Sequence, residues 1–391
     1  MLTYRAGILH VEGVPVPEIV APIGTPAYIY SLDEITRRVR AYRNALPHAL
    51  IAYAYKANAQ SPVIRHLAQL GCGADVVSGE ELRAALAAGV PPERIVFNGN
   101  AKLDEEIHLA VRVRVRSLNV DAREEIPRIA RIAAQVRSRA RITLRVNPGL
   151  DVHTHPHLRV GAPGSHFGIP PEDVLPAARE VVASPWLDLH GIHLHVGSQL
   201  LQLEELETVA REAARWVRTL RDAGFPVTEV DLGGGLGIPY DGAPGLDPMQ
   251  VAERWRPYLD PLDVQVVVEP GRWLVGPAGI LVLRVVQVKR AWGRTFVVVD
   301  GGMNVLLRPA LYGARHRIWP VVQGDPEIRV DVVGPNCESA DVLGRDYTLP
   351  PLSPGDLVAV LDVGAYGRSM ANRYNLRPLP REAVLHLMSN D

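Results

Sequence analysis

The stretch Ile51-Ala-Tyr-Ala-Tyr-Lys-Ala-Asn58 decides how the rest of the chain is interpreted. Its apolar first half is typical of a short buried strand, which runs directly into Lys56. The chain has only three lysines, and the other two, Lys102 and Lys289, stand beside charged residues and are expected to be solvated. Burial lowers the pKa of a lysine amine and makes it a nucleophile for carbonyl groups. The stretch predicts either such a reactive lysine or a strand-end lysine directed into water.

Composition and charge narrow the class of protein. A chain of 391 residues can form two or three domains with a large core. A hydrophobic content of 47% and a formal net charge of −1 argue against electrostatic capture of nucleic acid or of a membrane surface. No apolar run approaches the ~20 residues of a membrane span, and the N-terminus lacks a signal-peptide pattern. Cys72 and Cys337 cannot form a disulfide framework, so we expect a cytoplasmic protein.

Strand-like and helix-like segments alternate after the opening stretch. Eight such units over roughly 240 residues match the size of a (β/α)8 TIM barrel, with an open doubly wound sheet as the alternative. The expected strands lie near residues 50–55, 74–77, 95–97, 117–120, 142–146, 189–194, 229–232 and 264–268. The expected helices include residues 32–46, 79–88, 123–136, 171–182 and 203–223.

The helical period disappears after Glu269. Residues 280–287, 295–299, 328–333, 358–362 and 383–387 are typical of strands separated by Gly, Pro and Asp turns. Two strand-like segments near the N-terminus have no place in a barrel and are expected to join this β domain. The sequence therefore predicts a barrel over residues 28–270 and a β-sandwich or β-barrel domain made of residues 1–27 and 271–391.

Histidines and glycines follow the expected sixth and seventh barrel strands, at the carboxyl ends where such barrels hold their active sites. His193 and His195 could form a metal pair, although one of them is expected to pack inside the barrel. Ser198 lies just beyond and could donate its hydroxyl to a phosphate. The run Gly233-Gly234-Gly235 could cradle that phosphate with its N–H groups, whereas a glycine run alone is often only a turn.

Further candidates lie at the end of the eighth strand and in the β domain. Glu269 could face a protonated ring nitrogen or form an ion pair with Arg272. Arg308 and Tyr312 could clamp a carboxylate. A lone cysteine is usually buried, but Cys337 is flanked by Gly-Pro and by acidic residues and is expected to be exposed and functional.

These groups together point to pyridoxal 5'-phosphate, because this cofactor needs a reactive lysine, a phosphate site and a partner for its ring nitrogen. The cofactor would bond to Lys56, and Glu269 would keep its ring nitrogen protonated. An amino acid would then displace the lysine and lose its carboxylate as carbon dioxide. Cys337 is the candidate donor of the proton that replaces the carboxylate.

The chain resembles the fold-type III pyridoxal-phosphate decarboxylases, with their alanine racemase-like barrel, over nearly its whole length. Any one of the shared motifs is a weak signal, but together they fall in the family's order. They are Tyr53-Ala-Tyr-Lys-Ala-Asn58, Phe97-Asn-Gly-Asn-Ala-Lys102, His193-Leu-His-Val-Gly-Ser-Gln199, Asp231-Leu-Gly-Gly-Gly235, Glu269-Pro-Gly-Arg272, Gly334-Pro-Asn-Cys-Glu-Ser-Ala-Asp341 and Asp362-Val-Gly-Ala-Tyr366.

The resemblance implies a role for each matching residue. It implies that His195 stacks on the cofactor ring, and that Cys337 and Glu338 reach the site of a second subunit in a head-to-tail homodimer with two shared sites. Glu338 would hold the distal amino group of the substrate. The residues implied to hold the cofactor phosphate and its surroundings are Ser198, Gly234, Gly235, Gly271, Arg272 and Tyr366. Those implied to hold the substrate also include Arg308 and Tyr312.

The resemblance further implies decarboxylation of meso-2,6-diaminopimelate at its D-centre to L-lysine. The chain departs from the family at His166-Phe-Gly168 and Leu158-Arg-Val-Gly161, near His153, His155 and His157, which are expected to be solvated loop residues. Alternative substrates are carboxynorspermidine, ornithine and arginine. The sequence is also compatible with an amino-acid racemase, with a metal-dependent barrel hydrolase that uses His193 and His195, and with a non-catalytic cofactor carrier.

Overall fold

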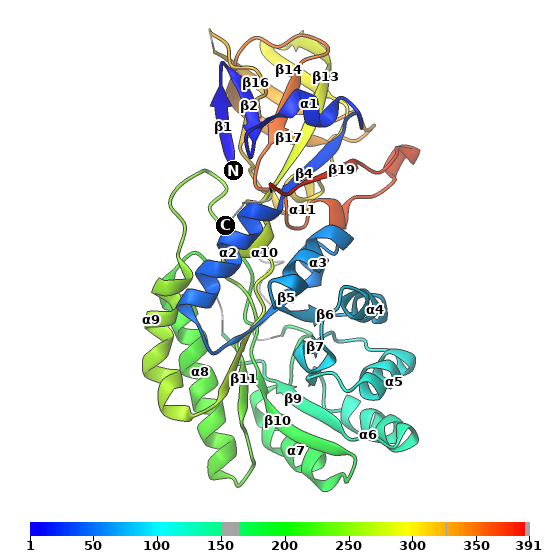
Figure 1. The fold of residues 1–391 in the computed structure, drawn as a ribbon, viewed down its shortest axis with the longest axis vertical. Coiled ribbons are helices and arrows are strands. Elements are labelled where there is room, and N and C mark those ends of the chain that lie inside the picture. Colours follow the sequence, from blue (N-terminus) through cyan, green and yellow to red (C-terminus); the bar gives the residue numbers. More distant parts are fainter. Residues whose placement is uncertain (151–160, 162–163, 326, 388–391) are drawn as a thin grey trace. The chain divides into compact units, whose positions relative to one another are not determined.

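The computed structural model describes residues 1–150, 161, 164–325 and 327–387, and the chain divides into two compact units (Figure 1). Unit 1 contains residues 1–37, 239–244 and 272–391, and unit 2 contains residues 38–238 and 245–271. The sequence predicts that the barrel begins at residue 28. In the structure the strand β4 (Ala27–Ser31) pairs with β13 and β19 of unit 1, so the chain leaves that unit later.

Unit 2 is a closed parallel barrel of eight strands, in which β12 pairs with β5 to complete the ring. This confirms the predicted (β/α)8 barrel and excludes the open sheet. The strands are β5 (Leu50–Ala54), β6 (Gly73–Val76), β7 (Ile95–Phe97), β8 (Ser117–Val120), β9 (Ala140–Arg145), β10 (Leu187–His193), β11 (Glu229–Asp231) and β12 (Gln265–Val268).

Helices connect successive strands of the barrel and surround it (Figure 1). In α8, Leu206, Val209, Ala213, Val217 and Leu220 recur at helical spacing and are buried, which gives the helix its barrel-facing side. The helices are α2 (Leu32–Ala45), which crosses the unit boundary, α3 (Ser61–Gln69), α4 (Gly79–Ala87), α5 (Asp104–Val113), α6 (Glu125–Val136), α7 (Pro171–Ala183), α8 (Leu203–Asp222) and α9 (Pro248–Leu259), with 3-10 helices η1 (Tyr55–Ala57), η2 (Pro92–Arg94) and η4 (Asp260–Leu262).

The barrel interior changes from apolar to polar along the strands. Leu50, Ala52, Val96 and Val267 form one buried cluster. Because alternate residues of a strand point to the same side, the positions two residues beyond Val96 and Val267 also face inward, and these are Asn98 and Glu269. The strands thus place an apolar layer beneath a polar one at their carboxyl ends.

Unit 1 contains a mixed sheet in the order β15-β18-β13-β14-β16-β17, joined by β4 and β19, and a separate three-stranded sheet β1-β2-β3. The N-terminal strands therefore belong with the C-terminal strands, as predicted. The strands are β1 (Leu2–Arg5), β2 (Ile8–Val11), β3 (Val14–Pro15), β4, β13 (Gly279–Ala291), β14 (Arg294–Val299), β15 (Ile318–Pro320), β16 (Ile328–Val333), β17 (Val342–Leu349), β18 (Leu357–Val360) and β19 (Arg381–Leu385).

The core of unit 1 joins both ends of the chain, because Leu9, Val11 and Ile29 pack in one buried cluster with Ile280 and Val282. The unit is not purely β as expected, since it also contains α1 (Val16–Val20), α10 (Arg272–Val275), α11 (Arg308–Tyr312), η5 (Arg368–Met370) and η6 (Tyr374–Leu376). Across the residues that the structure describes, no helix is both long and apolar enough to cross a membrane.

Candidate active site

Lys56 lies in the short η1 helix that directly follows β5. The five residues of β5 are buried, but the Lys56 side chain is 39% exposed at the carboxyl end of the barrel. Its Nζ lies 3.1 Å from Asp75 Oδ2, and Asp75 is almost fully buried on β6. The structure therefore places the lysine at the barrel mouth, with its amine held by a buried carboxylate rather than by water alone.

A chain of hydrogen bonds continues from Asp75 across the polar layer. Asn98 Nδ2 donates to Asp75 Oδ1 at 2.7 Å and to Glu269 Oε1 at 2.5 Å. Asn119 Nδ2 in turn donates to Asn98 Oδ1 at 2.8 Å, which fixes the orientation of the Asn98 amide. Lys56 and Glu269, which the sequence separates by most of the barrel, are thus linked through only two side chains.

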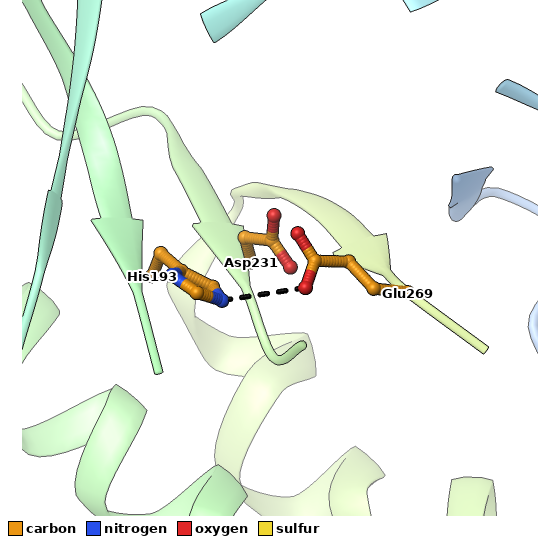
Figure 2. Close-up of side chains that lie close together, drawn as sticks. All are labelled: His193, Asp231 and Glu269. Atoms are coloured by element: carbon orange, nitrogen blue, oxygen red, sulfur yellow. Dashed lines mark ion pairs between the residues drawn. The ribbon is translucent and has the colours of Figure 1, made fainter. Parts of the chain in front are cut away.

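Glu269 follows β12 and is buried, with Oε2 3.4 Å from His193 Nε2 (Figure 2). Burial opposes its ionisation, but His193 and Lys56 hold the pKa of Glu269 well below its ordinary value. Glu269 is therefore a carboxylate at neutral pH. A buried, ionised carboxylate suits the protonated ring nitrogen of the predicted cofactor.

The two histidines at the end of β10 have different environments. His193 is buried and directed toward Glu269 (Figure 2), which confirms that one of the pair packs inside the barrel. His195 is half-buried, and its Nδ1 accepts a hydrogen bond from Gly234 N–H at 3.3 Å. Burial and the charge of Lys56 hold the pKa of His195 well below its ordinary value, so the ring is neutral. A neutral imidazole beside the glycine run fits the stacking position expected of His195.

The glycine run after β11 forms a close-fitting turn beside the histidines. Gly233 and Gly235 have φ angles of +63° and +123°, which side chains disfavour. A Cβ on Gly234 would lie 2.5 Å from Glu269 O, and one on Gly235 would lie 2.8 Å from Gly197 O. These glycines are therefore required by the backbone, and the turn fits a phosphate cradle formed by N–H groups. Ser198 is half-buried in the neighbouring loop.

A second cluster of sequence-predicted residues lies within unit 1. Arg272 Nη1 donates to Tyr240 OH at 2.6 Å, and its guanidinium lies 4.8 Å from the centre of the Tyr366 ring. Arg308 is buried, and its guanidinium lies 4.5 Å from the centre of the Tyr240 ring. The cluster brings Arg272, Arg308 and Tyr366 together around Tyr240, an arrangement suited to anionic groups. Tyr312 ends the same short helix that Arg308 begins and is half-buried.

Cys337 and Glu338 are exposed on the loop of residues 334–341, as the sequence indicated for the cysteine. Buried Asp341 shapes this loop, because its Oδ2 accepts from Asn336 N at 2.7 Å and from Asn336 Nδ2 at 2.8 Å. Cys337 N–H donates to Asn375 Oδ1 at 3.1 Å. The loop is thus ordered by buried contacts while it presents the thiol outward.

One sequence expectation is wrong. Lys102 is buried rather than solvated, and its Nζ lies 3.2 Å from Glu125 Oε2 and 2.6 Å from Gly99 O. The charged residues after Lys102 suggested an exposed helix start, but the helix begins only at Asp104 and the lysine turns inward. Lys289 is exposed as expected.

A group of possible metal ligands lies inside the barrel, but it differs from the histidine pair considered from the sequence. His193, Asp231 and Glu269 each place one potential ligand atom within 4.8 Å of the others (Figure 2). In the described part of the chain His195 does not belong to this group.

Residues 153–160, with the three loop histidines and the Leu158–Val160 departure, lie outside the described residues. His166 packs against Phe167, with ring centres 4.0 Å apart.

Several functional candidates were missed in the sequence. Asp75, Asn98 and Asp231 are polar residues within or directly after short buried strands, and this pattern could have identified them as barrel-interior groups. Tyr240 and His316 carried no such signal. For Tyr240 the reason is that residues 239–244 join unit 1 from within a barrel loop. Their role depends on long-range folding rather than on any local motif.

The chain is similar to known pyridoxal-dependent decarboxylases. Residues 32–276 match the family described as pyridoxal-dependent decarboxylase, pyridoxal binding domain. The diaminopimelate decarboxylase of Aquifex aeolicus is 39% identical over 391 aligned residues, covering 98% of this chain and 92% of the relative. That of Archaeoglobus fulgidus is 40% identical, covering 98% and 93%.

Solved structures show the same relationship. The diaminopimelate decarboxylase from Methanocaldococcus jannaschii, in complex with L-lysine, has a TM-score of 0.95 and 35% identity, covering 98% of this chain and 92% of that one. The Helicobacter pylori enzyme with L-lysine has a TM-score of 0.91 and 37% identity, covering 94% and 93%. This chain belongs to the diaminopimelate decarboxylase family of pyridoxal-dependent decarboxylases.

Proposed function

We propose that this chain is a pyridoxal-phosphate-dependent carboxy-lyase that converts meso-2,6-diaminopimelate into L-lysine and carbon dioxide, the last step of lysine biosynthesis. The observation that carries the proposal is the linked pair of Lys56 and Glu269 beside the glycine turn, in a chain that matches diaminopimelate decarboxylases over 98% of its length. The chain uses the cofactor for the chemistry that side chains cannot supply, which is to accept the electrons freed when the carboxylate leaves.

Most of the residues that would hold the cofactor belong to unit 2. Lys56 would form the covalent attachment, and Glu269 would face the ring nitrogen as a carboxylate. His195 would cover one face of the ring as a neutral imidazole. The phosphate would be held by Gly234 and Gly235 through their N–H groups, with Ser198, Gly271, Arg272 and Tyr366 as further partners.

The residues of unit 1 would serve the substrate. Arg272, Arg308, Tyr312 and Tyr366 offer cationic and hydroxyl groups for its carboxylates. Cys337 would deliver the proton that replaces the lost carboxylate, and Glu338 would bind the distal ammonium group. We also propose a homodimer in which Cys337 and Glu338 complete the partner's site, and a cytoplasmic location, which two unpaired cysteines favour.

The test is a substrate panel with the purified, cofactor-loaded protein. Carbon dioxide and the amine or amino-acid product are measured together for meso-diaminopimelate, ornithine, arginine and carboxynorspermidine. The proposal expects L-lysine and carbon dioxide in equal amounts from meso-diaminopimelate and little product from the others. Faster turnover of ornithine, arginine or carboxynorspermidine would move the substrate assignment to that amino acid and leave the reaction class unchanged.

A further inference from the structure

Two carboxyl groups face each other in the buried polar layer of the barrel, Asp231 at the end of β11 and Glu269 just after β12 (Figure 2). Asp231 is 1% exposed and Glu269 is 4% exposed. One oxygen of each lies within 4.8 Å of the other and of a ring nitrogen of His193. The proposed function uses Glu269, but it gives Asp231 no role.

The hydrogen-bond donors in this layer are divided unequally between the two groups. Glu269 Oε1 accepts from Asn98 Nδ2 at 2.5 Å, and Oε2 faces His193 Nε2 at 3.4 Å. Asp231 Oδ1 accepts from Gly233 N–H at 2.9 Å. Among the described residues no donor reaches Asp231 Oδ2. One oxygen of this buried pair therefore lacks the donor that an ionised carboxylate needs.

Electrostatics decides which group carries a proton. Two carboxylates this close in a buried site cannot both remain charged, and the proton settles on the one with fewer stabilising partners. Burial, and next the charge of Glu269, raise the pKa of Asp231 well above its ordinary value. The pKa of Glu269 moves in the opposite direction because His193 and Lys56 face it. Asp231 is thus the protonated member of the pair.

We propose that Asp231 is a positioning residue, which keeps a proton on Oδ2 and donates it as a hydrogen bond to Glu269. The donation occupies one side of the Glu269 carboxylate and leaves the group ionised and oriented toward the cofactor ring nitrogen. Asp231 acts through Glu269 and touches neither cofactor nor substrate. This inference deepens the proposed function and rests on the role given there to Glu269.

Further charged and titratable groups surround the pair from the neighbouring elements of the barrel. They are Lys56 of η1, Asp75 of β6, Arg145 of β9, His193 of β10, His195 just after it and Glu229 of β11. All of them are the same in wild type and in a variant changed only at Asp231. A difference in pH dependence between those two proteins therefore reports on Asp231 together with its coupled partner Glu269.

The first test is Asp231→Asn in the full-length, cofactor-loaded protein. Asparagine keeps the Oδ1 that accepts from Gly233 N–H, and its Nδ2 replaces the protonated Oδ2. Because the pKa of Asp231 is raised in the folded state, its contribution to stability is complete below its unfolded pKa and is lost as pH rises through the folded value. The wild-type thermal midpoint should therefore fall more steeply than that of Asp231→Asn as pH rises above the ordinary aspartate pKa of about 4.

Cofactor affinity, measured by equilibrium dialysis, provides the second readout. Asp231→Asn keeps a donor toward Glu269 and should change the dissociation constant by less than about threefold, whereas Asp231→Ala removes the donor and should weaken binding by about tenfold. Glu269→Gln removes the charge itself and should weaken binding at least as much as Asp231→Ala.

Asp331→Asn is the matched control, because Asp331 is a buried aspartate whose carboxylate is ion-paired with Arg294 at 2.8 Å. It should lower the thermal midpoint at neutral pH without changing cofactor affinity.

Several outcomes would overturn the proposal. Asp231→Asn contradicts the proposal if it loses as much cofactor affinity as Glu269→Gln. It also does so if its thermal midpoint changes with pH as steeply as that of wild type. A divalent metal bound stoichiometrically by wild type and lost in Asp231→Asn would show that Asp231 binds a cation instead. If the variants do not fold, the infrared spectrum of wild-type protein with carboxyl-labelled aspartate tests whether Asp231 is protonated. A protonated-acid band that persists at neutral pH is expected, and its absence contradicts the proposal. Wild-type turnover of meso-diaminopimelate tests the proposed function separately.

Discussion

Cys337 is the residue whose role depends least on the barrel. Its thiol is exposed on a loop held by Asp341, and substitution there should not disturb the folded core. Cys337→Ala should retain the cofactor and lower kcat by about 10²–10⁴-fold, since it removes the proposed proton donor. Bound cofactor is measured by absorbance and turnover by carbon dioxide release.

Cys72→Ala is the control for this prediction. Cys72 is buried directly before β6, at the amino end of a barrel strand, and burial raises the pKa of its thiol to about 11, which makes it a weaker acid than an ordinary thiol. This variant should keep turnover close to wild type. Full turnover by Cys337→Ala would remove the thiol from the reaction.

The glycine turn gives a second prediction at the residue scale. Gly235→Ala combines a φ of +123° with a Cβ 2.8 Å from Gly197 O, so it should cost about 1–3 kcal/mol and weaken cofactor binding. Gly224→Ala has a similar φ of +87° but meets no atom within 4 Å. It should lower the thermal midpoint without changing cofactor affinity. Equal cofactor affinity in the two variants would show that the turn is only structural.

Residue type and position in the sequence were enough to predict that Lys56 and the glycine run follow barrel strands and that Cys337 is exposed. They were not enough for Lys102. A lysine before Asp and Glu residues is usually solvated, and only the fold shows that Lys102 turns toward Glu125. Asp231 was visible only as the residue before a glycine motif, since its partner Glu269 follows it by a whole strand–helix unit.

At the scale of elements, the buried Lys102–Glu125 pair joins the segment before α5 to the first turn of α6. Lys102→Met should destabilise the protein by about 3–5 kcal/mol, because it leaves Glu125 buried without its cation. Chemical denaturation measures the change. Lys102→Met combined with Glu125→Gln should recover much of the loss, and Lys289→Met at an exposed site should cost little. A Lys102→Met variant as stable as Lys289→Met would contradict this.

The short helix α11 depends on a neutral histidine. His316 Nε2 faces Arg308 Nη1 at 2.7 Å and must accept, and Nδ1 faces Leu361 O at 2.9 Å and must donate. Burial and the charge of Arg308 lower the pKa of His316 to about 3. The unfolded state therefore binds an extra proton between about pH 3 and 6.5, and stability falls there by up to roughly 1.4 kcal/mol per unit of decreasing pH.

His316→Gln tests this sign, because glutamine can both accept and donate but does not titrate. The thermal midpoint of the variant should fall less steeply than that of wild type between about pH 6.5 and pH 4. Parallel slopes in the two proteins would mean that His316 is charged in the folded state or does not contribute to acid unfolding.

The predicted barrel elements match the observed ones because apolar strands and amphipathic helices have distinct periods, as in α8. The β domain was harder to predict. The strand β17 (Val342–Leu349) has two adjacent charged residues, Arg345 and Asp346, in its middle, and β15 has only three residues. The strand β15 is too short to distinguish from a turn, and it is defined by its pairing with β18, which lies about 40 residues further along the chain.

At the scale of the whole molecule, each unit is built from separate segments of the chain. The proposed dimer adds a second level, since each site would take Lys56 from one subunit and Cys337 from the other. Mixing inactive Lys56→Ala and Cys337→Ala proteins should then restore roughly a quarter of wild-type turnover, because half of the randomly formed dimers carry one intact site of two. No recovery after subunit exchange, confirmed with tagged subunits, would place both residues in one subunit's site.

The most direct test of the central claim is the identity of the lysine that carries the cofactor. The loaded protein is reduced with borohydride, digested, and its peptides are mapped by mass spectrometry. Only three lysines are available, which makes the assignment unambiguous. We expect one pyridoxyl group per chain, on the peptide that contains Lys56. A group on Lys102 or Lys289, or none on any lysine of a protein that still releases carbon dioxide and L-lysine, would contradict it.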